Sequence, residues 1–165
     1  MTKKILIVLF LPLMFACTSS HNKEYSKVDE MIQDAKKQVD YISLTDFNAA
    51  IESHNPMYLI DCREEDEFNT SCIKGAINIP RGILEGEISE KAPKHLQSVY
   101  MYCDNGKRST LAALTLELLK YSDVKVIEGG FDSLKTDFPK LVELNPVRGD
   151  AKTKTVAKPS DGCGG

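Results

Sequence analysis

The sequence lacks an excess of positive charge, and it shows no internal repeat. Its 21 lysines and arginines are outnumbered by 24 aspartates and glutamates, which gives a formal net charge of -3. A protein that binds nucleic acid needs a dense basic surface to neutralise phosphates, so that class of function is excluded. The chain has 165 residues, 42% of them hydrophobic, which is typical of one soluble globular domain with a single active site.

The sequence also lacks a hydrophobic run long enough to span a bilayer. The longest run, from Ile5 to Ala16, follows Lys3 and Lys4 and contains twelve residues. As a helix it rises only about 18 Å, well short of the ~30 Å hydrocarbon core. A basic start followed by a short apolar run is typical of a signal peptide, which we predict over residues 1–16. We therefore expect export to the periplasmic or cell-envelope side.

The end of this run predicts a lipid anchor. Met14 to Cys17 resembles a bacterial lipobox, in which a small residue precedes the cysteine that is acylated and becomes the mature N-terminus. The alternative is an ordinary signal peptide in which Cys17 is incidental. Residues 17–38 are predicted to hold the lipidated N-terminus, a tether and a short helix. Acyl chains on Cys17 would give membrane association without a basic patch.

Hydrophobic spacing predicts an α/β fold. Apolar residues recur at helical intervals from Val28 to Val39 and from Leu44 to Ile51, and Tyr41 begins a strand. Further strand candidates are the runs 57–60, 76–79, 99–102 and 124–127, with a leucine-rich helix at 109–121 between the last two. Strands that alternate with helices predict a parallel sheet covered on both faces. Residues 146–165 are predicted to form a flexible tail.

The loop from Cys103 to Ser109 carries the chemistry. It follows a predicted strand and begins a predicted helix, the position of reactive sites in open α/β sheets. Gly106 permits a backbone conformation closed to other residues, so that consecutive amides can turn inward around the Cys103 sulfur. The dipole of the following helix, with Lys107 and Arg108, favours the thiolate. A preformed thiolate attacks directly and needs no histidine base.

Three motifs together resemble those of the rhodanese family, over residues 41–141. Residues 59–68 followed by 73–80 are similar to the family's first signature, residues 103–109 to its active-site loop, and residues 126–131 to the segment near the end of the domain. The resemblance implies a rhodanese-like three-layer fold, with a central parallel sheet of about five strands and helices on both faces. We predict this domain over residues 39–145.

The resemblance implies a sulfurtransferase. The Cys103 thiolate would take sulfane sulfur from a donor such as thiosulfate, hold it as a persulfide and pass it to a thiol or cyanide-like acceptor. No cofactor or metal is implied, and no protein partner is indicated. The residues implied to bind substrate are Asp104, Asn105, Gly106, Lys107, Arg108 and Ser109.

The spacing within the loop favours sulfur over phosphate. Four residues separate Cys103 from Arg108. Phosphatase and arsenate reductase relatives have five, which gives a wider ring suited to a tetrahedral oxyanion. Asp104 departs from the family pattern, because many thiosulfate-using relatives carry a basic residue there. Its carboxylate opposes both thiolate formation and a dianionic donor, so thiosulfate is not assured as the substrate.

Residues near the first signature are predicted to be structural. Asp61 and Arg63 are expected to form an ion pair, and Cys62 between them is expected to be a small buried side chain. A disulfide between Cys62 and Cys72 is a less favoured alternative.

Two alternatives to sulfur transfer stay open. Cys163 in the tail is a candidate resolving or accepting thiol, or an incidental exposed one. The chain could be a thiol redox protein that pairs Cys103 with Cys163 or Cys72. It could also be a rhodanese-like binding module without turnover.

Overall fold

The computed structural model describes residues 24–93 and 96–146. The predicted signal peptide over residues 1–16, the predicted lipidation site Cys17 and the tail residue Cys163 lie outside the described residues. Within the described part of the chain, no helix combines the length and the apolar character needed to cross a membrane.

Helices and strands alternate along most of the chain. The α-helices are α1 (Val28–Ala35), α2 (Leu44–Glu52), α3 (Glu65–Thr70), α4 (Leu84–Lys91), α5 (Lys107–Leu118) and α6 (Gly130–Asp137). The strands are β1 (Asp40–Ile42), β2 (Met57–Asp61), β3 (Ser71–Ile73), β4 (Ile77–Asn78), β5 (Ser98–Tyr102), β6 (Val124–Ile127) and β7 (Val142–Leu144). Short 3-10 turns, η1 (Arg81–Ile83) and η2 (Pro139–Leu141), precede α4 and β7.

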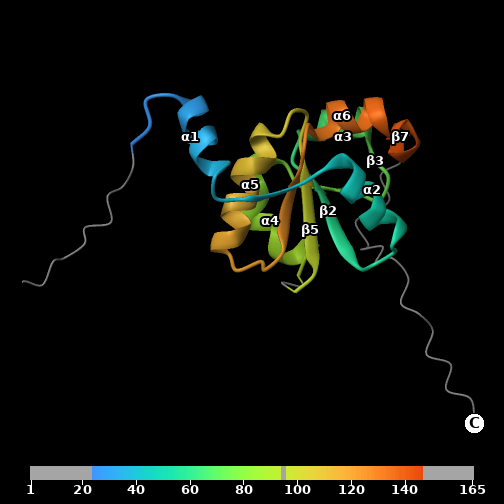
Figure 1. Ribbon diagram of the computed structural model, residues 1–165, viewed down its shortest axis with the longest axis horizontal. Helices are drawn as coiled ribbons and strands as arrows, with labels where there is room; N and C mark the ends of the chain where they lie inside the picture. The colour runs from blue at the N-terminus through green and yellow to red at the C-terminus, as the bar shows by residue number, and fades with distance from the viewer. Residues whose placement is uncertain (1–23, 94–95, 147–165) are drawn as a thin grey trace, which may run out of the picture.

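A five-stranded parallel sheet forms the centre of the domain, in the order β1-β6-β5-β2-β4 (Figure 1). The central strand β5 pairs with β2 through Leu59 and Tyr100, and with β6 through Met101 and Val126. Because the strands of this sheet are parallel, they all end at the same edge, where the loops that follow β2 and β5 meet. The predicted α/β fold with about five parallel strands is confirmed.

Each face of the sheet has its own hydrophobic core, because successive side chains of a strand point to opposite faces. Along β5, Val99 and Met101 join the core under α4 and α5, whereas Tyr100 and Tyr102 join the core under α2 and α6. Figure 1 shows α4 and α5 on one side of the sheet and α2, α3 and α6 on the other. The three layers match the fold that the sequence predicts.

The structure adds elements that hydrophobic spacing did not predict. β3 and β7 form a separate antiparallel pair in which Cys72 lies opposite Glu143. Helix α3 is only six residues long and begins with a capping box between Glu64 and Glu67. Helix α1 ends at Ala35, earlier than the predicted Val39, because β1 begins at Asp40 and the chain must turn before it.

Candidate active site

The loop after β5 turns sharply at Gly106 and enters α5. Gly106 is the N-cap of α5, and its φ of 87° lies in the left-handed region that glycine adopts without steric cost. Its carbonyl accepts hydrogen bonds from the Thr110 hydroxyl at 2.7 Å and from the Ser109 hydroxyl at 3.2 Å. The Thr110 hydroxyl is in turn hydrogen-bonded to that of Tyr41 on β1, at 2.6 Å. The loop is thus fixed from the side of β1.

The N-terminus of α6 fixes the loop from the other side. The Phe131 N–H donates to the carbonyl oxygen of Cys103 at 2.7 Å, and the Asp132 N–H donates to that of Asp104 at 3.1 Å. In a trans peptide the C=O and the following N–H point in opposite directions. Because these two carbonyls point at α6, the N–H groups of Asp104 and Asn105 point away from it.

The remaining loop amides are available to an anion. The Lys107 N–H has a loop partner, the Asn105 Oδ1 at 3.2 Å, and the Asp104 N–H faces its own carboxylate. Among residues 24–93 and 96–146, no acceptor is found for the amides of Asn105, Gly106, Arg108 and Ser109. Unpaired amides at the start of a helix bind anions, because their N–H dipoles and the helix dipole act together.

Cys103 lies on the face of the sheet opposite α6. Its side chain belongs to the core under α4 and α5, on the side toward which the Asp104 and Asn105 amides point. The Ser109 hydroxyl lies 3.7 Å from the Cys103 Sγ and can donate to it. The residue is 0% exposed, so the sulfur has no direct contact with solvent in this conformation.

The two basic residues of the loop are paired with carboxylates, which the loop sequence alone did not indicate. Arg108 makes a two-pronged ion pair with Glu67 of α3, at 2.7 and 2.9 Å, and a further one with Asp104 at 2.6 Å. Lys107 reaches Asp29 of α1 at 2.9 Å. Acidic residues of α1 and α3 compete for these cations, and the fold that brings them there is not visible in the loop sequence.

These ion pairs shift the pKa values of the groups that form them. The hydrogen bond from Arg108 lowers the pKa of Glu67, and the partner carboxylates raise that of Arg108. Burial works to raise the pKa of Asp104, but the hydrogen bond and charge of Arg108 outweigh it and the pKa falls. Arg108 is thus held as a cation between two carboxylates at neutral pH.

The expected Asp61–Arg63 ion pair is present and buried. The Arg63 Nη2 lies 2.6 Å from the Asp61 Oδ2, and it also donates to the Ser71 carbonyl at 2.7 Å. The guanidinium carbon stacks 3.9 Å from the centre of the Phe131 ring. This pair therefore ties β2 and β3 to α6, which holds the Cys103 carbonyl.

The described cysteines are Cys62, Cys72 and Cys103, all buried free thiols. No Cys62–Cys72 disulfide is formed, because Cys72 lies on β3 in the small sheet whereas Cys62 follows β2 in the core that contains Cys103. Burial, and then the charges of Glu143 and Asp61, raise the pKa of Cys72 to about 11. Cys62 is buried as predicted, but it lies beside Cys103.

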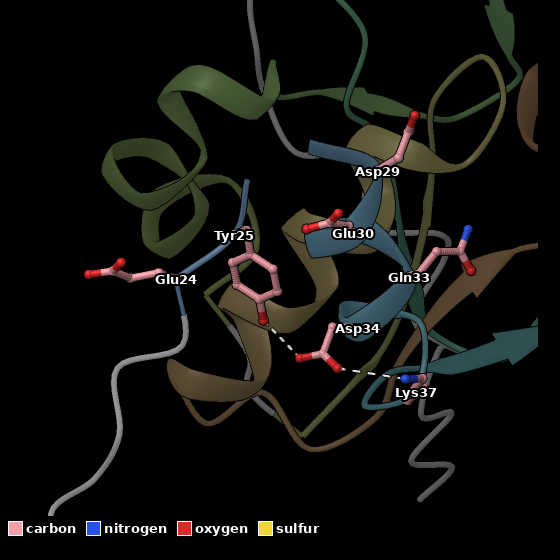
Figure 2. A pocket seen from close by; sticks show the side chains of 7 residues that line it. All are labelled: Glu24, Tyr25, Asp29, Glu30, Gln33, Asp34 and Lys37. Atoms are coloured by element: carbon pink, nitrogen blue, oxygen red, sulfur yellow. Dashed lines mark hydrogen bonds and ion pairs between the residues drawn. The ribbon is translucent and has the colours of Figure 1, made fainter. Parts of the chain in front are cut away.

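Surface hollows lie beside α1 and between α3 and α6, and Cys103 lines neither of them. Figure 2 shows the one beside α1, where the Tyr25 hydroxyl donates to Asp34 at 2.7 Å. It is lined by Glu24, Tyr25, Asp29, Glu30, Gln33, Asp34 and Lys37. The other lies between α3 and α6 and is lined by Arg63, Asp66, Glu67, Thr70, Ser71, Asp104, Phe131, Asp132 and Lys135. The excess of carboxylates in the first hollow disfavours an anionic sulfur donor there.

Three residues of the site were not identified from the sequence. Glu67 pairs with Arg108 across 41 positions, and no local pattern reveals such a partner. Gly130 lies in the third family motif, but only the structure shows why a glycine is needed beside Cys103. Cys62 had a signal in the sequence, since it lies just after the predicted strand 57–60, as Cys103 lies just after the predicted strand 99–102.

Comparisons with known proteins agree with this geometry. The family model described as "Rhodanese-like domain" matches residues 43–137, more than half of the chain. YrkF of Bacillus subtilis, named as a candidate sulfur carrier protein, is 32% identical over 76 residues, which cover 46% of this chain and 40% of YrkF. A mitochondrial protein of Schizosaccharomyces pombe, named as a candidate thiosulfate sulfurtransferase, is 34% identical over 77 residues, which cover 40% of this chain and 54% of that protein.

A solved structure gives a similar result. The thiosulfate sulfurtransferase from Pseudomonas aeruginosa superposes with a TM-score of 0.55 at 31% identity, covering 59% of this chain and 19% of that one. The chain thus spans about half of these relatives' length or less. With the fold, the Cys103 loop and the match over residues 43–137 in agreement, the chain belongs to the rhodanese-like domain family.

Proposed function

We propose that this protein is a sulfurtransferase that carries sulfane sulfur as a persulfide on Cys103. One observation carries the proposal: the carbonyls of Cys103 and Asp104 are held by α6, so that unpaired loop amides point toward the face on which the Cys103 side chain lies. The named sulfur-carrier and sulfurtransferase relatives support the same reaction class.

The reaction has two steps. The Cys103 thiolate attacks the outer sulfur of a donor, the donor's S–S bond breaks, and its remaining fragment leaves with the electron pair; with thiosulfate this fragment is sulfite. The outer sulfur stays on Cys103 as an anionic persulfide, to which the loop amides can donate. An acceptor thiolate or cyanide then attacks that outer sulfur and Cys103 leaves as a thiolate. The amides stabilise the charge in both steps, as in an oxyanion hole.

The charges around the loop favour a donor with less negative charge than thiosulfate. Arg108 is already neutralised by Glu67 and Asp104, and Glu64 lies 3.7 Å from it. A dianion approaching Cys103 would meet these carboxylates, whereas both basic residues of the loop, Lys107 and Arg108, are already paired. We therefore propose a small thiol persulfide as the better donor.

Burial of Cys103 limits which molecules reach it. A donor meets the sulfur only after loop side chains move, since the residue is 0% exposed. Small donors need the smallest such movement. We expect small alkylating reagents to modify Cys103 faster than bulky ones of equal intrinsic reactivity.

The experiment that tests the proposal is intact-mass and peptide mass spectrometry after incubation with a sulfane donor. The reduced protein is treated separately with thiosulfate and with an organic persulfide, and the expected product gains one sulfur atom on Cys103. Cys103→Ser should gain none at this position. Absence both of this gain and of released sulfide with every donor, in a protein whose Cys103 still reacts with iodoacetamide, would contradict sulfur transfer. Normal ligand binding by Cys103→Ser would instead favour the binding-module alternative.

We also propose that the protein is exported and anchored through Cys17. The support is the sequence of residues 1–17 alone: two lysines, a short apolar run and a lipobox-like end.

A further inference from the structure

Cys62 and Cys103 occupy facing positions on neighbouring parallel strands. Asp61 at the end of β2 pairs with Tyr102 at the end of β5. The Cys62 N–H then donates to the Tyr102 carbonyl at 2.8 Å, so the ladder continues for one more residue on each strand. In a parallel ladder, a residue that donates to the carbonyl of Tyr102 lies opposite the next residue, which is Cys103.

The two cysteine side chains also point to the same face of the sheet. Alternate residues share a face, and Ile60, Cys62, Met101 and Cys103 all belong to the core under α4 and α5. Neighbouring strands lie about 4.8 Å apart, inside the range of about 4.4–6.8 Å between Cα atoms that a disulfide spans. The two thiols are therefore within bonding reach after side-chain rotation.

Resting on the proposed function, we propose that Cys62 is the resolving thiol of this site, which attacks the Cys103 persulfide, forms a Cys62–Cys103 disulfide and releases hydrosulfide. Both residues are 0% exposed. A sulfur buried in this way is hard for a large external acceptor to reach, whereas Cys62 is already beside it. An internal resolving thiol thus allows the second step of the reaction to proceed without a large external acceptor reaching the buried sulfur.

The step balances without an oxidant. The Cys62 sulfur attacks the inner sulfur of the persulfide, and the bond between the inner and outer sulfur atoms breaks. The outer sulfur leaves with the electron pair and takes the Cys62 proton, so an anionic persulfide and a thiol give a disulfide and HS⁻. The two cysteines are oxidised and the sulfane sulfur is reduced to sulfide. An external dithiol then reduces the disulfide and restores both thiols.

The raised pKa of Cys62 agrees with its attack on the persulfide as a protonated thiol. Burial first, and then the negative charge of Cys103, raise the pKa of Cys62 well above its ordinary value. Cys62 therefore stays protonated at neutral pH. Its proton is then available to the leaving sulfide.

Sulfide release in a single turnover tests the proposal. Reduced full-length protein is loaded with an organic persulfide, freed of excess donor and left without added thiol. Wild type should release about one sulfide per loaded Cys103, and acid quenching with alkylation and peptide mapping should find Cys62 linked to Cys103. Cys62→Ala should keep its persulfide, with sulfide release lowered at least about tenfold. Cys72→Ala, another buried cysteine of the chain, should behave as wild type.

A peroxide experiment separates this proposal from the proposed function. Hydrogen peroxide converts the Cys103 thiolate to a sulfenic acid, which condenses with the Cys62 thiol to give the same disulfide and water. A Cys62–Cys103 disulfide after peroxide, with neither persulfide nor released sulfide from any donor, would support the thiol pair while the sulfurtransferase fails. The resolving role of Cys62 would be overturned by a stable persulfide in wild type together with one of two peroxide results: Cys103 oxidised beyond sulfenic acid, or Cys103 linked to Cys163. The sulfurtransferase proposal would stand in that case.

Discussion

The backbone N–H of Phe131 donates to the carbonyl oxygen of Cys103 across 2.7 Å. This bond joins the first turn of α6 to the residue that we propose as the nucleophile. It exists because Gly130 adopts a φ of 62° and lets α6 approach the loop closely. The orientation of the loop amides thus depends on a glycine that lies outside the loop.

Gly130→Ala should remove this orientation. A Cβ at this position would lie 2.4 Å from the Cys103 carbonyl oxygen and 2.5 Å from that of Asp104, which is a steric clash with backbone. The left-handed conformation adds about 1–2 kcal/mol for any residue with a Cβ. We expect persulfide loading to fall at least about tenfold and the free energy of unfolding to fall by about 2–4 kcal/mol, as urea titration can measure.

Gly86→Ala is the matched control for this substitution. Gly86 lies within α4, and a Cβ there meets nothing within 4 Å. Alanine in a helix interior should stabilise the protein by up to about 1 kcal/mol and leave loading unchanged. Equal loss of loading in both variants would show that the Gly130 contact has no special role.

Asp104→Asn should improve the use of thiosulfate. The substitution removes a negative charge beside Cys103 and releases one of the two close partners of Arg108. We expect kcat/KM for thiosulfate to rise about tenfold, with a smaller gain for a neutral donor. Asp66→Asn, which removes an exposed carboxylate of α3, is the charge-matched control. An equal gain from both variants would indicate a general effect of net charge.

Stability should fall in acid partly through the Arg108 ion pairs. The pKa values of Glu67 and Asp104 are lower in the folded protein than in the unfolded chain, where they are about 4. Their ion pairs with Arg108 therefore stabilise the fold fully above the unfolded pKa values. This stabilisation is lost as the pH falls through the lower, folded pKa values. The side chains are 35% and 40% exposed, so each contributes less than about 1 kcal/mol after screening. Unfolding of Arg108→Ala, followed from pH 7 to pH 3, should show a shallower fall. A curve parallel to wild type would contradict this assignment.

Asp61→Ala should destabilise the protein strongly. It leaves Arg63, whose side chain is 5% exposed, without its carboxylate partner. Removing one member of a buried ion pair costs about 3–5 kcal/mol, which urea unfolding can detect. The comparison is Glu85→Ala, which breaks the surface pair with Arg81 and should cost less than about 1 kcal/mol. Similar losses in the two variants would show that burial of the Asp61–Arg63 pair is not decisive.

Cys17→Ser should release the protein from the membrane. If Cys17 carries the anchor, wild type should be recovered in the membrane fraction of a bacterial host and should incorporate labelled fatty acid. The variant should lose the label, because serine cannot form the thioether. Equal labelling of both proteins would contradict lipidation at Cys17, and a wild-type protein without any membrane fraction would contradict the anchor.

The elements predicted from sequence are those with a strong hydrophobic period. Runs such as Met57–Asp61 and Ser98–Tyr102 are buried on both faces and read clearly as strands. Helix α3 and the short pair β3–β7 escaped prediction, because they are held by caps and by contacts with distant segments rather than by their own periodicity.

The candidate site likewise contains features that the sequence predicts and features that it does not. The loop after β5 was predictable, since Cys103, Gly106 and Arg108 form a local pattern. The pairing of Arg108 with Glu67 and the contact of Gly130 with the loop depend on the tertiary fold. Local spacing predicts the place of the proposed nucleophile directly after β5, but not the distant residues that contact the loop.

The loop around Cys103 is secured by Tyr41 near the beginning of the domain and by Phe131 near its end. A nascent chain that has not yet emerged beyond residue 131 cannot form the second of these supports. Formation of the anion cradle is therefore delayed until nearly the whole domain has been synthesised. A partly translated chain would lack this arrangement of loop amides, and the sulfur chemistry that we propose for Cys103 would begin only when the domain closes.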